Sequence, residues 1–127
     1  MRTYNHVTLM GHVATDPELR QTKNGKMVTS FALATDRDWI DSSGEKRKVA
    51  DFHKIVVWQK LAEICTKFLS KGAAVMIDGR LSNRQYELAD NEKRSVTEVV
   101  ADNVNIIKLK TAKDGDNKVV LQDVDSK

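Results

Sequence analysis

Hydrophobic and polar residues alternate along several stretches of the chain, with the period of two that is typical of a half-buried β-strand. The clearest example is VTLMGHV at residues 7–13, where Val7, Leu9 and Val13 share one face. Four further stretches, rich in β-branched residues, lie at 27–39, 51–60, 73–88 and 95–107. The pattern therefore predicts five strands.

The same alternation assigns a core face to each strand. In the third strand we expect His53, Ile55 and Val57 on the core face. On the fourth strand the expected core-facing row is Val75, Ile77, Gly79 and Leu81. Two polar segments, DSSGEKRK at 41–48 and ADNEKR at 89–94, are predicted as a mobile loop and a turn.

Between the third and fourth strands the hydrophobic period changes to that of an amphipathic helix. The positions at i, i+3, i+4, i+7 and i+8 are Leu61, Ile64, Cys65, Phe68 and Leu69. Gly72 follows at a position suited to a left-handed C-cap. Five strands with one helix after the third are typical of an all-β, Greek-key barrel of the oligonucleotide/oligosaccharide-binding type, the OB-fold. We expect the apolar stripe of the helix to close one end of that barrel.

The length of 127 residues and the hydrophobic content of 40% suit a single core. We expect the barrel domain at residues 1–110 and a polar tail at 111–127, either disordered or holding a short strand at KVVLQDV. The chain has no apolar run near the roughly 20 residues of a membrane span and no segment like a signal peptide, which favours a cytoplasmic location.

Basic residues exceed acidic ones, and the excess belongs to the predicted barrel. The whole chain has a formal net charge of +3, whereas the tail from Thr111 onward holds three lysines and four aspartates. Residues 1–110 therefore carry a net charge of +4. This mild basicity favours an anionic partner without proving one.

Four aromatic residues each have a basic residue two positions away, and therefore on the same strand face. The pairs are Arg37 with Trp39, Phe52 with Lys54, Trp58 with Lys60, and Arg84 with Tyr86. One aromatic on a strand is more often part of the core, but a lysine between two core-facing rings would have to be paired or expelled. Exposed rings can instead stack on unpaired bases, at roughly 1–3 kcal/mol per base, while cations contact the phosphates. The pattern therefore predicts a site for single-stranded nucleic acid that tolerates any sequence.

The remaining aromatic, cysteine, acidic and histidine residues do not indicate a catalytic or metal site. Phe31, Phe68 and Cys65 fall on predicted core faces. The acidic cluster around Trp39 and the three histidines lack the spacing of a metal or acid–base site, and no phosphate loop or nucleophile motif is present. We expect no catalytic activity, no metal and no cofactor.

Six segments closely resemble the bacterial single-stranded DNA-binding proteins, in the order and spacing of that family, from about Val7 to Ile107. They are LMGHVATDPELR, FALATDRDW, DFHKIVVWQKLAE, FLSKG, IDGRL and TEVVADNV. The resemblance implies an OB-fold, a homotetramer in which the first strand pairs with its copy, and single-stranded DNA wrapped around the assembly. It also implies roles in protecting DNA during replication, recombination and repair, with a location near the nucleoid.

The resemblance further implies which residues contact DNA. Trp39, Phe52 and Tyr86 match the main stacking positions of the family, and Trp58 matches a further aromatic position. Basic residues near the DNA path are matched by Lys54, Lys60, Lys71 and Arg84. The segment from Asn83 to Arg94 resembles a long hairpin that folds over the DNA, which adds Arg94 to the candidate site.

The C-terminus departs from the family. Relatives end in a short acidic and hydrophobic tip that recruits replication and repair proteins, whereas this chain ends KDGDNKVVLQDVDSK. This departure puts recruitment by that route in doubt, while replication and repair proteins stay candidate partners. Two alternatives remain open from the sequence: an OB-fold interaction subunit of a replication or primosome assembly, and an RNA-binding OB domain.

Overall fold

The computed structural model describes residues 1–109, so the predictions for the tail at 111–127 lie outside the described residues. The elements in chain order are β1 (Val7–Val13), β2 (Arg20–Gln21), β3 (Met27–Ile40), β4 (Lys46–Trp58), α1 (Gln59–Phe68), β5 (Ala74–Glu87) and β6 (Lys93–Lys108). Within residues 1–109 no helix is long and apolar enough to cross a membrane.

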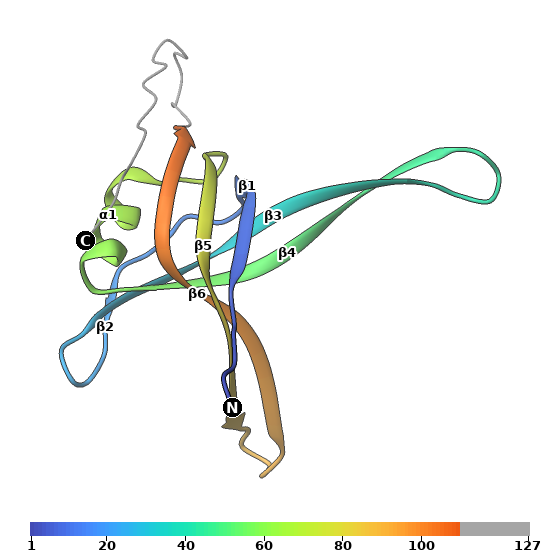
Figure 1. Cartoon of the computed structure of the whole chain (residues 1–127). Coiled ribbons are helices and arrows are strands. Elements are labelled where there is room, and N and C mark those ends of the chain that lie inside the picture. Colours follow the sequence, from blue (N-terminus) through green and yellow to red (C-terminus); the bar gives the residue numbers. More distant parts are fainter. Residues whose placement is uncertain (110–127) are drawn as a thin grey trace.

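The strands form one sheet that closes on itself. The order is β1-β5-β6-β4-β3-β2. A further pairing, of β1 with β3, closes the sheet into a barrel. That closure is short, at His12 with Ala34 and Val13 with Leu33. The predicted five-stranded barrel is therefore confirmed. Because the two-residue β2 is an additional strand, the helix lies between β4 and β5 (Figure 1).

The core lies inside the barrel and consists of the side chains on the inward face of each long strand. The most completely buried side chains include Leu33, Ile55, Val57, Val75, Ile77, Val104 and Ile106. The helix adds Leu61, Ala62 and Cys65. Leu69, which directly follows the helix, is also buried. Burial raises the pKa of the Cys65 thiol to about 12. The helix therefore closes one end of the barrel as predicted, and Cys65 is confirmed as a core residue.

Two details of the helix differ from the prediction. Phe68 is 40% exposed, because the buried stripe centres on Leu61, Ala62 and Cys65 and Phe68 lies at its edge. The Lys67 ammonium lies 5.7 Å from the centroid of the Phe68 ring. Gly72 has a left-handed φ of 102° but is not the C-cap, since the helix ends at Phe68 and Leu69 caps it in an extended conformation. Gly72 instead turns the chain back to β1, where its N–H donates to the Val13 carbonyl.

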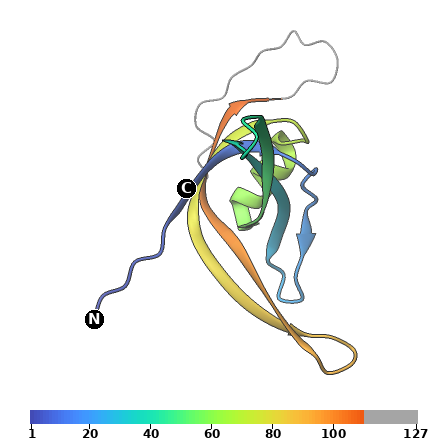
Figure 2. The ribbon, with the colours of Figure 1, turned by 90° about the vertical axis from the view of Figure 1, so that its right-hand side faces the viewer.

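Two hairpins project beyond the barrel as arms (Figures 1 and 2). The β3–β4 arm keeps a continuous antiparallel register out to Ile40 with Lys46. The predicted loop at 41–48 is therefore too long, because β4 already begins at Lys46. The β5–β6 arm runs out to Glu87 with Lys93. Leu81 is exposed although it continues the predicted core face, because the pairing of β5 with β1 ends at Gly79 and β1 does not flank β5 beyond it.

The turn of the β3–β4 arm is organised by Asp41. Its carboxylate accepts hydrogen bonds from the Ser43 hydroxyl at 2.7 Å, from the N–H of Glu45 at 3.0 Å and from Arg47 Nε at 2.9 Å. Gly44 supplies the positive φ, 86°, that the turn requires. These bonds, with the Ser43 hydroxyl first, lower the pKa of Asp41 from 3.8 to about 2.

We expect the order of this turn to depend on pH. Since the folded pKa is the lower one, the stabilisation is fully present above 3.8 and is lost as the pH falls through about 2. The amide shifts of Ser43 and Glu45, followed by NMR, should change with a midpoint near the lower value, and Asp41→Asn should abolish that transition. A midpoint near 3.8 would contradict the hydrogen-bonded carboxylate.

Candidate nucleic-acid interface

A groove of about 600 Å³ crosses the outer face of the barrel over β3, β4, β6 and β5. It is lined by Arg20, Val28, Ser30, Lys54, Val56, Trp58, Arg80, Ser82, Arg84, Glu98 and Val100. Strand register explains this set, because Val56 pairs with both Ser30 and Val100, and Val100 pairs with Arg80. These four residues form one row across four strands. The lining therefore combines one aromatic ring, four cations and one carboxylate.

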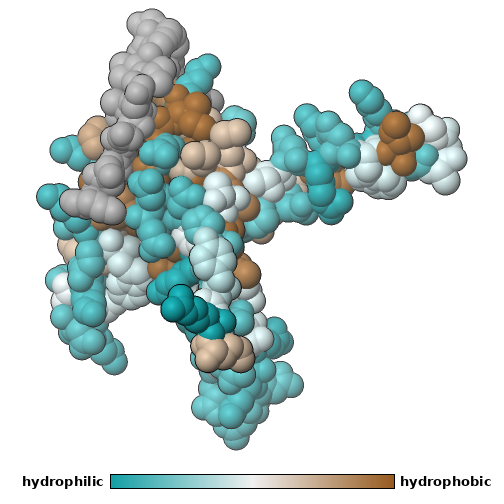
Figure 3. Space-filling view, viewed as in Figure 1, coloured by the Kyte–Doolittle hydropathy of each residue, from teal (hydrophilic) through white to brown (hydrophobic). Residues whose placement is uncertain are grey.

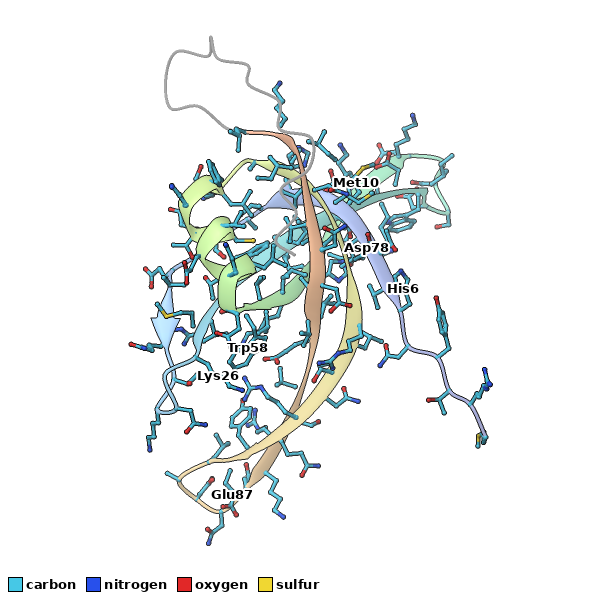
Figure 4. All side chains as sticks on the ribbon, turned by 60° about the vertical axis from the view of Figure 1, so that its left-hand side comes forward. His6, Met10, Lys26, Trp58, Asp78 and Glu87 are labelled. Carbon is cyan, nitrogen blue, oxygen red and sulfur yellow. The ribbon has the colours of Figure 1, made fainter. Side chains whose placement is uncertain are left out.

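β4, the third strand predicted from the sequence, carries Phe52 and Trp58 on this outer face, as the alternation predicted. Trp58 is 39% exposed and lines the groove, between the β2–β3 hairpin and the β5–β6 arm (Figure 4). Phe52 is 66% exposed and lines an adjoining hollow of about 370 Å³, which shares Ser30 and Lys54 with the groove. The two rings and Lys54 therefore follow one continuous hollowed surface.

Tyr86 extends this surface onto the β5–β6 arm. It is exposed and stands two residues from Arg84, on the same side of β5, and opposite Arg94 in register. The surface of this arm is mostly hydrophilic (Figure 3). The exposure predicted for Phe52, Trp58 and Tyr86 is confirmed, and we call the three rings and the groove between them the outer groove.

Trp39 is also exposed, as predicted, but it does not line the outer groove. It pairs with Arg47, whereas Phe52 pairs with Ala34, five residues earlier on β3. An odd separation puts Trp39 and Ala34 on opposite faces of the strand. Trp39 therefore lies with Arg37 and Arg47 on a separate patch of the β3–β4 arm. Long two-stranded ribbons twist strongly, so alternation alone does not fix where that patch points.

The predicted cations divide in a similar way. Lys54 and Arg84 line the groove, and Arg94 lies on the adjoining arm. Lys60 is exposed in the first turn of α1, and Lys71 follows the helix, where its backbone N–H donates to Asp16 Oδ1 at 2.7 Å. Neither of these two lysines lines the groove.

Three groove residues were missed from the sequence: Arg20, Arg80 and Glu98. The signal for Arg80 was present, because it lies four residues before Arg84 and so on the same face of β5. Arg20 belongs to the two-residue β2, which is too short to show a pattern. Glu98 is only 5% exposed and binds two of the cations, a partnership that depends on the pairing of distant strands.

Glu98 joins β4 and β5 through its carboxylate. Its Oε2 accepts hydrogen bonds from Arg84 Nη2 at 2.9 Å and Nε at 3.1 Å, and it lies 3.3 Å from Lys54 Nζ. Burial acts to raise the pKa of Glu98, but the bonds from Arg84 and Lys54 outweigh it and leave that pKa below its ordinary value. The same bond raises the pKa of Arg84. Glu98 and Arg84 are therefore both charged at neutral pH.

The histidines have ordinary polar partners. His6 Nε2 lies 3.1 Å from Thr8 Oγ1 and 3.5 Å from Asp78 Oδ1, and His53 Nε2 lies 2.9 Å from Thr35 Oγ1. His53 is half-buried, in line with its predicted core-facing row. In the part of the chain that the structure describes, no three His, Cys, Asp or Glu side chains gather as a metal site would require.

Comparison with known proteins agrees with this geometry. The Single-strand binding protein family matches residues 4–107. Single-stranded DNA-binding protein 1 of Chlorobaculum tepidum is 40% identical over 117 residues, which cover 90% of this chain and 71% of that protein. The Staphylococcus aureus single-stranded DNA-binding protein is 41% identical over 120 residues, which cover 94% and 76%.

A solved structure supports the same relationship. The Plasmodium falciparum SSB complex with ssDNA superposes with a TM-score of 0.70 at 29% sequence identity. The match covers 79% of this chain and 88% of that chain. The agreement therefore extends from sequence to the arrangement of the strands. This chain belongs to the single-strand binding protein family.

Proposed function

We propose that the protein binds and protects single-stranded DNA without regard to sequence, during replication, recombination and repair. The observation that carries this proposal is the outer groove, where three exposed aromatic rings stand beside basic side chains. Every base has a flat π-face, so stacking tolerates any sequence. The protein is not an enzyme and needs no cofactor for this activity.

Each part of the groove has a distinct role in this mechanism. Phe52, Trp58 and Tyr86 stack on bases, while Lys54, Arg84 and Arg94 contact phosphates. Arg20 and Arg80 line the same groove and add to its positive charge. Duplex DNA binds poorly, because its bases already stack on each other and present no free face. We extend the path by resemblance to Trp39, Lys60 and Lys71, which lie outside the groove.

The assembly is a homo-oligomer, and we propose a tetramer. Support comes from β1, which pairs with β5 from Val7 to His12 but with β3 only at its last two residues. Within residues 1–109, the other edge of β1 is thus open to a strand from a second copy. His6, directly before β1, and Met10 mark the course of β1 in Figure 4, and Asp78 marks the neighbouring β5.

We further propose that residues 1–110 form the DNA-binding domain and that 111–127 form a polar tail. The protein acts in the cytoplasm, associated with the DNA of the nucleoid. Replication and repair proteins are candidate partners.

The test is a competition experiment with a fluorescent oligo-dT bound to the protein. Unlabelled single-stranded DNA should displace the probe at far lower concentration than a duplex of the same length. Log affinity should also fall linearly with log salt, because basic side chains displace counterions from the strand. Equal competition by duplex would refute the proposal. A matched RNA strand decides the RNA-binding alternative: it would have to compete better than DNA to favour that function.

A further inference from the structure

The outer groove contains one acidic residue among its four cations, and this residue lies between two of them. Glu98 is 5% exposed, whereas the side chains of Lys54 and Arg84 are 45% and 54% exposed. DNA can therefore reach the two cations, whereas the carboxylate that binds them is almost fully buried. The inference below rests on the proposed function of this groove.

The carboxylate of Glu98 resembles a phosphate in how it is bound. Arg84 approaches Oε2 with both Nε and Nη2, at 3.1 and 2.9 Å, and Lys54 Nζ approaches the same oxygen at 3.3 Å. A guanidinium fork binds carboxylates and phosphates with the same geometry. A phosphate on the groove would consequently compete with Glu98 for the same N–H groups.

We propose that Glu98 is a built-in competitor for the DNA phosphates. It occupies Lys54 and Arg84 in the empty groove, so that the strand binds by exchanging partners with it. The three side chains present a net charge of one to the strand instead of two. Glu98 thereby lowers affinity and shortens the lifetime of the complex, which keeps the protein exchangeable along DNA.

Whether one substitution strengthens or weakens oligo-dT binding distinguishes this role from simple positioning of the cations. Glu98→Gln keeps the size and a hydrogen-bond acceptor but removes the charge. If Glu98 competes with phosphate, the variant binds oligo-dT more tightly and releases it more slowly. If Glu98 only holds Lys54 and Arg84 in place for DNA, the variant binds more weakly.

The expected magnitude follows from counterion release. For single strands the slope of log affinity against log salt changes by about 0.7 for each protein charge that meets a phosphate. Glu98→Gln should therefore steepen the slope by about 0.7, which amounts to about fivefold tighter binding for each tenfold fall in salt. The control is Glu63→Gln, an exposed residue of α1 outside the groove. It removes the same charge from the protein and should leave the slope unchanged.

A second variant gives an answer even if Glu98→Gln does not fold. Arg84→Met with Glu98→Met removes the half-exposed guanidinium together with the buried carboxylate, so that no buried charge is left without its partner. Lys54 then remains alone with a net charge of one, so the salt slope should equal that of the parent protein. A slope flatter by about 0.7 would show that Arg84 had been fully available to DNA, and it would overturn the proposal.

Failure of this proposal can be distinguished from failure of the proposed function. If the parent protein fails to bind oligo-dT, the proposed function is wrong. If the parent binds and Glu98→Gln leaves the slope unchanged or weakens binding, only the role of Glu98 is wrong.

Discussion

Replacing both Phe52 and Trp58 with alanine is expected to weaken binding of oligo-dT by about 2–6 kcal/mol, since each lost stack costs about 1–3 kcal/mol. Phe52 is 66% and Trp58 39% exposed, and neither belongs to the buried core, so their loss removes little from it. The measurement is a titration of fluorescent oligo-dT with the protein at fixed salt, followed by the fluorescence of the oligonucleotide. Because the cations remain, the slope of log affinity against log salt should stay close to that of the parent protein.

The matched control is Phe68→Ala. Phe68 is exposed to the same extent as Trp58 but lies on α1, away from the outer groove. It should leave binding unchanged. Equal losses in the control and the double variant, or no loss in the double variant, would mean that the rings of the outer groove do not stack on bases.

Replacing Gly79 with alanine should destabilise the barrel by about 3 kcal/mol or more, beyond the usual cost of overpacking a core. The added Cβ would lie 2.1 Å from the Val100 carbonyl oxygen and 3.0 Å from the Ala101 Cα. Both belong to the neighbouring backbone of β6, which cannot rotate away. In thermal unfolding followed by circular dichroism, the midpoint should fall by more than about 10 °C.

Gly44→Ala is the control that distinguishes the steric clash at Gly79 from the loss of stability expected when a glycine of positive φ is replaced. Gly44 has a positive φ of 86° but nothing within 4 Å of an added Cβ. Only backbone strain of about 1–2 kcal/mol is expected there. The two variants should be compared at one protein concentration, because assembly contributes to stability. A Gly79→Ala protein as stable as Gly44→Ala would contradict the close approach of β5 and β6.

The alternation of the sequence predicted the barrel and the exposure of Phe52 and Trp58, because a period of two states directly which side chains share a face. Its errors fall where an element leaves the core. Phe68 lies at the edge of the helix stripe, and Leu81 lies on β5 beyond the part that β1 flanks. At such positions a hydrophobic residue keeps its place in the pattern although nothing covers it.

Features that depend on strand pairing could not be predicted in the same way. The binding of Glu98 to Lys54 requires β4 and β6 to be neighbours, although they are far apart in the chain. The separation of Trp39 from Phe52 requires the register of the β3–β4 arm. A single sequence contains the residues but does not state which strand lies beside which.

Tryptophan fluorescence tests the central claim most directly, because the protein has only two tryptophans. In Trp39→Phe, all of the tryptophan emission comes from Trp58 in the outer groove. We expect oligo-dT to quench that emission strongly and a duplex of equal length to leave it nearly unchanged. If oligo-dT does not quench Trp58, or if the duplex quenches it equally, unpaired bases do not stack in the groove and the account is wrong.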